Sequence, residues 1–448
     1  MMLGVADPVT APVHSRALAV PLLRPGMKMA LYVLILMSLI SLVGAYDRYL
    51  VGILVESIKR DLKVSDGQVG LLTGLGFALV YSLLAVPVAR LSDGGRRVPV
   101  LAAALALWSA MTALCGVASG FPMLLLARMG VGVGEAGCVP TTQAILSDHF
   151  PARWRATAIA IATVASGIGL TLATVYGGWV ADHWGWRAAF MVGAVPGPVL
   201  AWLLWATLRK PVARGLICAA PPPHRTMRGA VGTLLRVRSL RLIYIGYSVA
   251  TMAAYATISW VPAFLMRSQH LSASRVGASY GAINGMAMII ALFAGGVLGD
   301  VLGRRDQRWL VWQMGACFLL ACPMTVAFLM AHDFNTVLCL TAPMTMLAMG
   351  SSSIAYATIQ GLAGPRLRAT GSALFLLFYN LAGVGIGPSL VGWLSDGLQG
   401  RFGTEALRMA LVGMSTTYVL GGLIILLAHA SIRQDMAAAS QRGASPIG

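Results

Sequence analysis

Charge is what this sequence has least of. Only 11% of its 448 residues are Asp, Glu, Lys or Arg, and Asp and Glu together number 15. Soluble domains carry about a quarter charged residues. A chain with 58% hydrophobic residues and a mean hydropathy of +0.77 therefore cannot present a hydrated surface along its whole length. The composition excludes an ordinary soluble domain and indicates a protein whose solvent is lipid.

Cysteine is also scarce, and no catalytic or metal-binding pattern accompanies it. The six cysteines lie almost entirely within apolar stretches and form no CxxC pair. The histidines are scattered through loops and helix ends, and none stands beside a nucleophile in the sequence. We therefore predict no disulfide, no metal, no cofactor and no enzymatic activity. The cysteines are Cys115, Cys138, Cys218, Cys317, Cys322 and Cys339.

Long uncharged stretches recur along the chain. A helix needs roughly 20 residues to cross a hydrocarbon core, and only helices and closed barrels satisfy their backbone hydrogen bonds there. The sequence predicts an all-α polytopic membrane protein with twelve transmembrane helices in two bundles of six. The predicted spans are 29–56, 67–90, 98–119, 121–147, 155–181, 187–208, 241–266, 275–299, 309–330, 334–361, 369–395 and 406–430.

The basic residues are sorted by loop. If the N-terminus is cytoplasmic, the loops on that side hold most of the 33 Lys and Arg, which fixes the orientation and places both termini in the cytoplasm. The sorting also argues against nucleic acid as the partner of the +18 net charge. The predicted organisation is an N-terminal tail (1–28), a first six-helix bundle (29–208), a basic linker (209–240), a second bundle (241–430) and a C-terminal tail (431–448). Residues 1–27 lack the apolar core of a cleavable signal, and we expect the first helix to be retained.

Four of the predicted helices end in one pattern, a small residue followed four positions later by Asp. The copies are Ala89 to Asp93, Gly178 to Asp182, Gly296 to Asp300 and Gly392 to Asp396. Corresponding copies are offset by 207 and 214 residues, and the triplet Arg-Ala-Thr recurs at an offset of 213. A duplicated six-helix unit explains these offsets, and an even number of helices gives both copies the same orientation. The solute site of such a protein lies between its halves.

The two cytoplasmic copies of the pattern are followed by arginines. An Asp at a helix end can accept hydrogen bonds from a neighbouring helix N-terminus and from nearby arginines, so we predict a conformational latch there. The sequence Gly296-Val-Leu-Gly-Asp-Val-Leu-Gly-Arg-Arg305 resembles the signature loop of the major facilitator superfamily. The first copy departs from that signature because Gly94 replaces a basic residue. The latch residues are Asp93, Arg96, Arg97, Asp300, Arg304 and Arg305.

Four ionisable residues fall well inside the predicted helices, all in the N-terminal half: Asp47, Arg48, Arg128 and Glu135. A charge at mid-bilayer costs on the order of 3 kcal/mol or more unless it faces a partner or water. Arg128 and Glu135, seven residues apart, share one helix face, whereas the adjacent Asp47 and Arg48 diverge by about 100°. We therefore expect one of the latter to face a cavity and the other a neighbouring helix.

This charged set suits proton coupling. Burial raises a carboxyl pKa and a nearby guanidinium lowers it, so a change in their distance switches the affinity for a proton. Asp47 and Glu135 are the predicted proton carriers, and Arg48 and Arg128 are their charge partners or bind an anionic headgroup. A static ion-pair network that holds the first and fourth helices together is the open alternative.

The surrounding residues make the resemblance more specific. Asp47-Arg48, the run Ser65-Asp-Gly-Gln-Val-Gly-Leu-Leu72, the run Arg128-Met-Gly-Val-Gly-Val-Gly-Glu-Ala136 and Ser147-Asp-His-Phe-Pro151 resemble the Spinster-like branch of the superfamily. The C-terminal half matches at superfamily level only. The resemblance implies a proton-linked transporter of an amphipathic lipid such as a lysophospholipid or sphingoid-like molecule, and it assigns the four charges to coupling and headgroup binding.

The seventh and tenth predicted helices face the helices that carry the four charged residues, and they contain no charge themselves. Their polar groups stand among methionines and aromatic residues, which suits the tail of a headgroup-plus-tail molecule better than it suits a sugar. The serines are equally consistent with close helix packing. The predicted cavity lining, with the two intrahelical asparagines, is Tyr255, Ser259, Trp260, Ser352, Tyr356, Gln360, Asn284 and Asn380.

These observations leave three functions open. The first is a carrier that works by alternating access, binds a small amphipathic substrate and protons, and resides as a monomer among the lipids of a bacterial inner membrane. The second is a multidrug or small organic anion carrier of the same superfamily. The third, a membrane enzyme or receptor on this fold, would need a catalytic cluster that the sequence does not offer.

Overall fold

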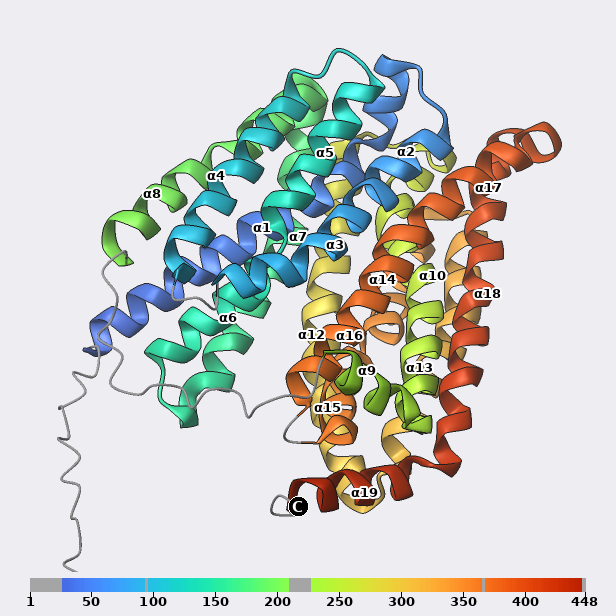
Figure 1. Cartoon of the computed structure of the whole chain (residues 1–448). Coiled ribbons are helices and arrows are strands. Elements are labelled where there is room, and N and C mark those ends of the chain that lie inside the picture. The colour runs from blue at the N-terminus through green and yellow to red at the C-terminus, as the bar shows by residue number, and fades with distance from the viewer. Residues whose placement is uncertain (1–25, 93–95, 209–226, 365–366, 445–448) are drawn as a thin grey trace, which may run out of the picture.

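The protein is helical throughout the part of the chain that the structure describes. This computed structural model describes residues 26–92, 96–208, 227–364 and 367–444, and no strand occurs among them (Figure 1). Ten of their helical spans are long and apolar enough to cross a membrane, so the chain is an integral multi-pass membrane protein.

Two of the ten spans are far longer than one crossing requires. They run over Arg153–Leu208, 56 residues, and Thr370–Ala430, 61 residues. Each contains a glycine with positive φ, Gly185 at 83° and Gly403 at 54°, a conformation that favours glycine. These glycines lie between the fifth and sixth and between the eleventh and twelfth predicted helices. Counting two passes in each span would give twelve, and that number stays a prediction.

The described residues of the N-terminal half form eight α-helices. They are α1 (Met27–Leu62), α2 (Asp66–Thr73), α3 (Leu75–Leu91), α4 (Arg97–Gly116), α5 (Phe121–Glu135), α6 (Cys138–His149), α7 (Ala152–Ala194) and α8 (Pro196–Leu208).

The C-terminal half follows the described end of the linker. Its helices are α9 (Met227–Arg236), α10 (Arg238–Ser268), α11 (Ala273–Val276), α12 (Ala282–Arg305), α13 (Arg308–Met330), α14 (Phe334–Met349), α15 (Ser352–Ala363), α16 (Arg368–Tyr379), α17 (Gly387–Phe402), α18 (Ala406–Leu426) and α19 (Ile432–Ala444). Short π-helical turns, η2 (Gly277–Gly281) and η3 (Asn380–Ile386), join α11 to α12 and α16 to α17.

The fourth and tenth predicted helices are each divided in two. The span 121–147 breaks between α5 and α6, where Gly137 has a φ of 78°. Pro140 in the first turn of α6 lacks the N–H that a first turn leaves unpaired, so it favours a new helix start there. The span 334–361 breaks at the turn of Gly350 and Ser351. Each pair of helices still forms one apolar span long enough to cross a membrane, Phe121–His149 and Phe334–Ala363, in agreement with the predicted spans.

The two halves contact each other at one end of the bundle. We call the end where α1 finishes and α2 begins the closed end, and the end with the start of α1 and with α19 the tail end; toward the tail end the ribbons of the halves diverge (Figure 1). One continuous core of buried apolar residues joins the two halves; it includes Leu50, Leu72 and Trp260 and extends through the C-terminal half to Ile432 of α19. Near the tail end a separate core belongs almost wholly to the N-terminal half and includes Val33 and Leu105.

The predicted C-terminal tail contains a helix that packs beneath the second half. Helix α19 lies across the tail ends of its neighbours (Figure 1). Its Asp435 accepts a hydrogen bond from the backbone N–H of Ser239 in the first turn of α10, at 2.9 Å. Its Arg433 forms an ion pair with Asp306, between α12 and α13. A carboxylate at a helix N-terminus is favourable, so α19 holds the tail ends of these helices together.

Candidate functional site

Helix α5 packs closely on its neighbours through alternate glycines. A Cβ at Gly134 would lie 2.6 Å from the Cβ of Trp108 on α4, and one at Gly132 would lie 2.9 Å from the carbonyl oxygen of Phe77 on α3. Small residues at such spacing let helices approach closely in a membrane. The face that carries Arg128 and Glu135 meets α1.

Arg48 and Glu135 form the first ion pair of this site. The Nη2 and Nε atoms of Arg48 donate to Oε2 of Glu135 at 2.5 and 3.2 Å. The Glu135 side chain is only 2% exposed, whereas that of Arg48 is 25% exposed. The guanidinium also lies over the rings of Phe77 and Tyr81, 5.4 Å from each centroid. The pair therefore joins a buried carboxylate to a cation that remains accessible and is held by aromatic faces.

Asp47 and Arg128 form a second, fully buried pair. Thr112 of α4 donates to Oδ2 of Asp47 at 2.9 Å. Nη1 of Arg128 lies 3.8 Å from Oδ1 of Asp47 and donates to its carbonyl oxygen at 3.4 Å. The adjacent Asp47 and Arg48 thus face different surroundings, as their angular separation on a helix requires. Two ion pairs now connect α1 with α5.

Each pair leaves hydrogen-bonding capacity unused. Oε1 of Glu135, Oδ1 of Asp47 and Nε of Arg128 are buried and have no hydrogen-bond partner among the described residues. Buried polar atoms are nearly always satisfied, and exceptions mark places where a water, a proton or a ligand can act. The charged site is therefore incomplete as a static network.

A tyrosine pair lies in the C-terminal half. The hydroxyls of Tyr255 on α10 and Tyr379 at the end of α16 are 2.5 Å apart. Tyr255 packs against the tail-end core of the N-terminal half, so it reaches across to the half that carries the charges. Tyr356 meets Phe375 edge to face at 5.0 Å. Together these rings form an aromatic wall with few free hydroxyls.

Of the other predicted lining residues, some lie where helices or halves meet, and the rest lie within the C-terminal half. Trp260 is fully buried, and its indole N–H donates to the carbonyl oxygen of Pro388 at 2.8 Å, which holds α10 against α17. The carbonyl of Ser259 faces Gly52 of α1 where the halves meet. Ser352 accepts from Tyr247, and Gln360 is exposed. Asn380, the first residue of η3, donates to the carbonyl oxygen of Leu376 in α16.

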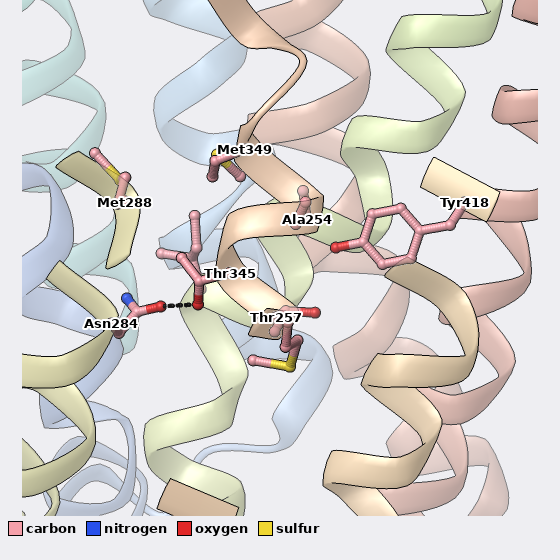
Figure 2. A pocket seen from close by; sticks show the side chains of 10 residues that line it. Ala254, Thr257, Asn284, Met288, Thr345, Met349 and Tyr418 are labelled. Carbon is pink, nitrogen blue, oxygen red and sulfur yellow. Dashed lines mark hydrogen bonds between the residues drawn. The ribbon is translucent and has the colours of Figure 1, made fainter. Parts of the chain in front are cut away.

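Asn284 lies inside the C-terminal half, away from the charged set. Its Oδ1 accepts from Thr345 Oγ1 at 2.7 Å, beside a cavity of about 10 Å³ that Met288, Met349 and Tyr418 help to line (Figure 2). A volume of this size is what one water molecule needs. Asn284 therefore belongs to a small, mainly apolar pocket between α10, α12, α14 and α18.

Several contacts of the site escaped the sequence analysis. Tyr379 and Phe375 could have been found from the sequence, because two aromatic residues four positions apart lie on one helix face. Thr112 carried none, because a single threonine in an apolar helix is common. At the closed end, Asp66 and Arg267 pair across the two halves, and both were passed over as loop residues.

The predicted latch residues that the structure describes do not join the halves in this conformation. Asp93 lies outside the described residues, and Arg96 is exposed. Arg97 pairs with Asp148 of its own half. Asp300, Arg304 and Arg305 are exposed, and within the described ranges none of them forms an ion pair. Among the residues that the structure describes, no cluster of three or more His, Cys, Asp or Glu could hold a metal ion.

Comparisons with known proteins agree with this architecture. The family model described as Major Facilitator Superfamily matches residues 37–388. An MFS-type efflux pump of Mycolicibacterium smegmatis is 35% identical over 417 residues, which cover 92% of this chain and 96% of that protein. Human Protein spinster homolog 1 is 27% identical, with coverages of 90% and 81%. The crystal structure of a bacterial homolog of the human lysosomal transporter Spinster, inward-facing and unoccupied, superposes with a TM-score of 0.84 at 26% identity, covering 92% of this chain and 99% of that one.

Proposed function

Because this chain is a Spinster-like transporter of the major facilitator superfamily, we propose that it moves an amphipathic lipid across the membrane by alternating access, coupled to protons. The substrate class is a lysophospholipid or sphingoid-like molecule. The observation that carries the proposal is the ion pair of Arg48 with Glu135, which joins a cation with access to solvent to a buried carboxylate.

The pair provides a simple coupling mechanism. Protonation of Glu135 removes the negative charge that holds Arg48, and the freed guanidinium can then bind an anionic headgroup in a bidentate manner. Binding of the proton and of the headgroup therefore favour each other, while deprotonation restores the ion pair and expels the headgroup. Phe77 and Tyr81 keep the guanidinium in place during the exchange.

The opposite wall supports a lipid tail. Tyr255 and Tyr356, both half-buried, offer ring surfaces without charge, and Tyr356 rests edge to face on the buried Phe375. A charged wall opposite an aromatic wall matches a molecule with one polar and one apolar end. A sugar would require more amides and carboxylates than these residues provide.

The orientation follows the positive-inside rule. The tail end then lies in the cytoplasm of a bacterium, in the inner membrane, and the closed end lies outside. In that orientation the present conformation faces inward, the state named for the Spinster homolog. We place both termini on the cytoplasmic side and treat the transporter as a monomer.

A multidrug carrier is the second candidate, because the relative from Mycolicibacterium smegmatis is described as an efflux pump. Reconstituted protein separates the two functions. We expect saturable uptake of a labelled lysophospholipid that an imposed pH gradient accelerates and that collapse of the gradient slows. Transport of organic drugs without lysolipid uptake would favour the efflux function, and currents independent of lipid would contradict both.

A further inference from the structure

Two aspartates at the closed end bind helix N-termini of the opposite half. Oδ2 of Asp182, on α7, accepts from the backbone N–H of Ser274 in α11 at 2.7 Å. Asp396, on α17, accepts from the N–H groups of Asp66 and Gly67 in α2 at 3.0 and 2.8 Å. The first contact runs from the N-terminal to the C-terminal half, and the second runs in the reverse direction.

The glycine four residues before each aspartate makes the same contact in both places. A Cβ at Gly178 would lie 2.6 Å from the carbonyl oxygen of Ala273, the first residue of α11. A Cβ at Gly392 would lie 2.3 Å from the carbonyl oxygen of Asp66, the first residue of α2. Any larger residue would push the helices apart, so the small residue and the aspartate act as one unit.

The receiving helices also correspond to each other. Each begins after a serine N-cap: the side chain of Ser65 accepts from the N–H of Gln68, and that of Ser272 accepts from the N–H of Arg275. The serine satisfies one free N–H of the first turn. The aspartate from the other half satisfies another, and its charge interacts favourably with the positive end of the helix. The two contacts are thus the same structure built twice by the duplicated unit.

We propose that Asp182 and Asp396, each with its preceding glycine, form a matched pair of clasps that hold the closed end shut and that must both release before this end can open. The proposal rests on the alternating access proposed above and is independent of the substrate. The geometry is specific because each clasp joins helices of different halves, so neither contact can survive separation of the halves.

The two clasps differ in strength. Asp396 is half-buried and accepts two backbone hydrogen bonds, from the N–H groups of Asp66 and Gly67. The Asp182 clasp is exposed to solvent and makes one backbone hydrogen bond, to Ser274. Loss of Asp396 should therefore open the closed end more often than loss of Asp182.

The copy of the pattern formed by Gly296 and Asp300, at the tail end, makes no such contact within the described part of the chain. Asp300 follows Gly296 by four residues but is exposed and forms no hydrogen bond or ion pair with any described residue. The clasped closed end and the free Asp300 fit a cycle in which the pattern engages at one end at a time.

The test measures access to the closed end. In a cysteine-free background, Ser389→Cys places a thiol on α17 against Gly70 of α2, in the buried contact between the halves, where a maleimide reaches it only when the closed end opens. We expect Asp182→Ala and Asp396→Ala each to accelerate labelling, with the larger effect for Asp396, and the double variant to accelerate it at least tenfold. Asp61→Ala is the matched control, because Asp61 lies at the same end and pairs with Arg187 of its own half. Its labelling rate should equal that of the parent.

A second thiol distinguishes opening from unfolding. Met314→Cys, buried within the C-terminal half, should stay protected in every variant. If the alanine variants expose Met314→Cys, the shape-conserving Asp182→Asn and Asp396→Asn replace them, and we expect an intermediate acceleration. Labelling of Ser389→Cys at the parent rate in the double variants overturns the proposal. The assay needs neither substrate nor pH gradient, so its failure is distinct from a failure of lipid transport.

Discussion

Arg267 donates to both carboxylate oxygens of Asp66 across the two halves of the protein, at 2.7 and 2.8 Å. The Asp66 side chain is 5% exposed and that of Arg267 is 21% exposed. Lys59 of α1 adds a third cationic hydrogen bond to Asp66 at 2.6 Å, and Glu56 accepts from Arg267. A bidentate pair of this kind fixes both distance and orientation, so it sets how closely the halves meet at the closed end.

This pairing predicts a non-additive effect on stability. Asp66→Asn and Arg267→Gln should each lower the melting temperature in detergent, because each leaves a mostly buried charge without its main partner. The double variant should lose less than the sum, with a coupling of about 1–3 kcal/mol. Glu56→Gln is the control, since it removes only a second acceptor of Arg267. Additive losses for Asp66 and Arg267 would mean that the pair contributes no mutual stabilisation.

Substitution of Glu135 tests the proposed coupling of transport to protons. Glu135→Gln keeps the shape of the side chain but removes the titrating group, so acceleration of lysolipid uptake by a pH gradient should fall by about tenfold or more, a change of about 1.4 kcal/mol. Exchange of lysolipid without a gradient should continue, because Arg48 is then free for the headgroup. Glu405→Gln, which alters a half-buried pair with Arg408 at the closed end, should retain the gradient dependence. A Glu135→Gln protein with unchanged gradient dependence would support the static network instead.

The sequence was sufficient for the helices and for the charged set, and the physical reason is the same for both. Lipid tolerates no unpaired backbone polar groups and few charges. Long apolar spans and the four intrahelical charges can therefore be recognised in the sequence without knowing how the helices pack. Which carboxylate pairs with which guanidinium depends on the rotation of α1 about its axis against α5. The orientation of α5 in this pairing is set by packing such as Gly134 on Trp108 of α4, which no sequence pattern specifies.

Other features depend on conformation, so sequence alone could not place them. The four copies of the small-residue and aspartate pattern look equivalent in sequence, yet Asp182 and Asp396 are engaged while Asp300 is free. Likewise Trp260 looked like a cavity residue by its helix, but its indole bonds to Pro388 inside the interface. Positive φ at Gly137 divides the fourth predicted helix, and the nearby Pro140 was the available signal.

Gly134 gives a prediction about close packing. Gly134→Ala would place a methyl group 2.6–2.9 Å from the Cβ, backbone nitrogen and Cα of Trp108, and backbone atoms cannot rotate away. Overpacking of this kind costs about 1–3 kcal/mol, and it should displace Glu135 from Arg48. We expect a lower melting temperature together with reduced transport. Gly413→Ala is the matched control, because its Cβ would meet no atom within 4 Å in helix α18. Equal stability of the two variants would contradict the close approach of α4 and α5.

The docking of α19 predicts a response to acid. The hydrogen bond from Arg433 lowers the pKa of Asp306 below its ordinary value of about 4. Because the folded pKa is the lower one, the stabilisation from this pair is complete above about pH 4 and is lost as the pH falls through the lowered pKa. A spin label at the exposed Gln434 should therefore remain ordered down to about pH 4 and become mobile below it.

Variants of the same pair separate this step from general acid unfolding. Arg433→Gln removes the group that lowers the pKa of Asp306, so the label should be more mobile at neutral pH, and any remaining step should move up toward pH 4. Asp306→Asn abolishes the titration itself and should flatten the profile in this range. Asp435, which holds the N-terminus of α10, is unchanged in both variants, so a mobility profile identical to that of the parent would assign the docking of α19 to Asp435 rather than to the pair of Arg433 and Asp306.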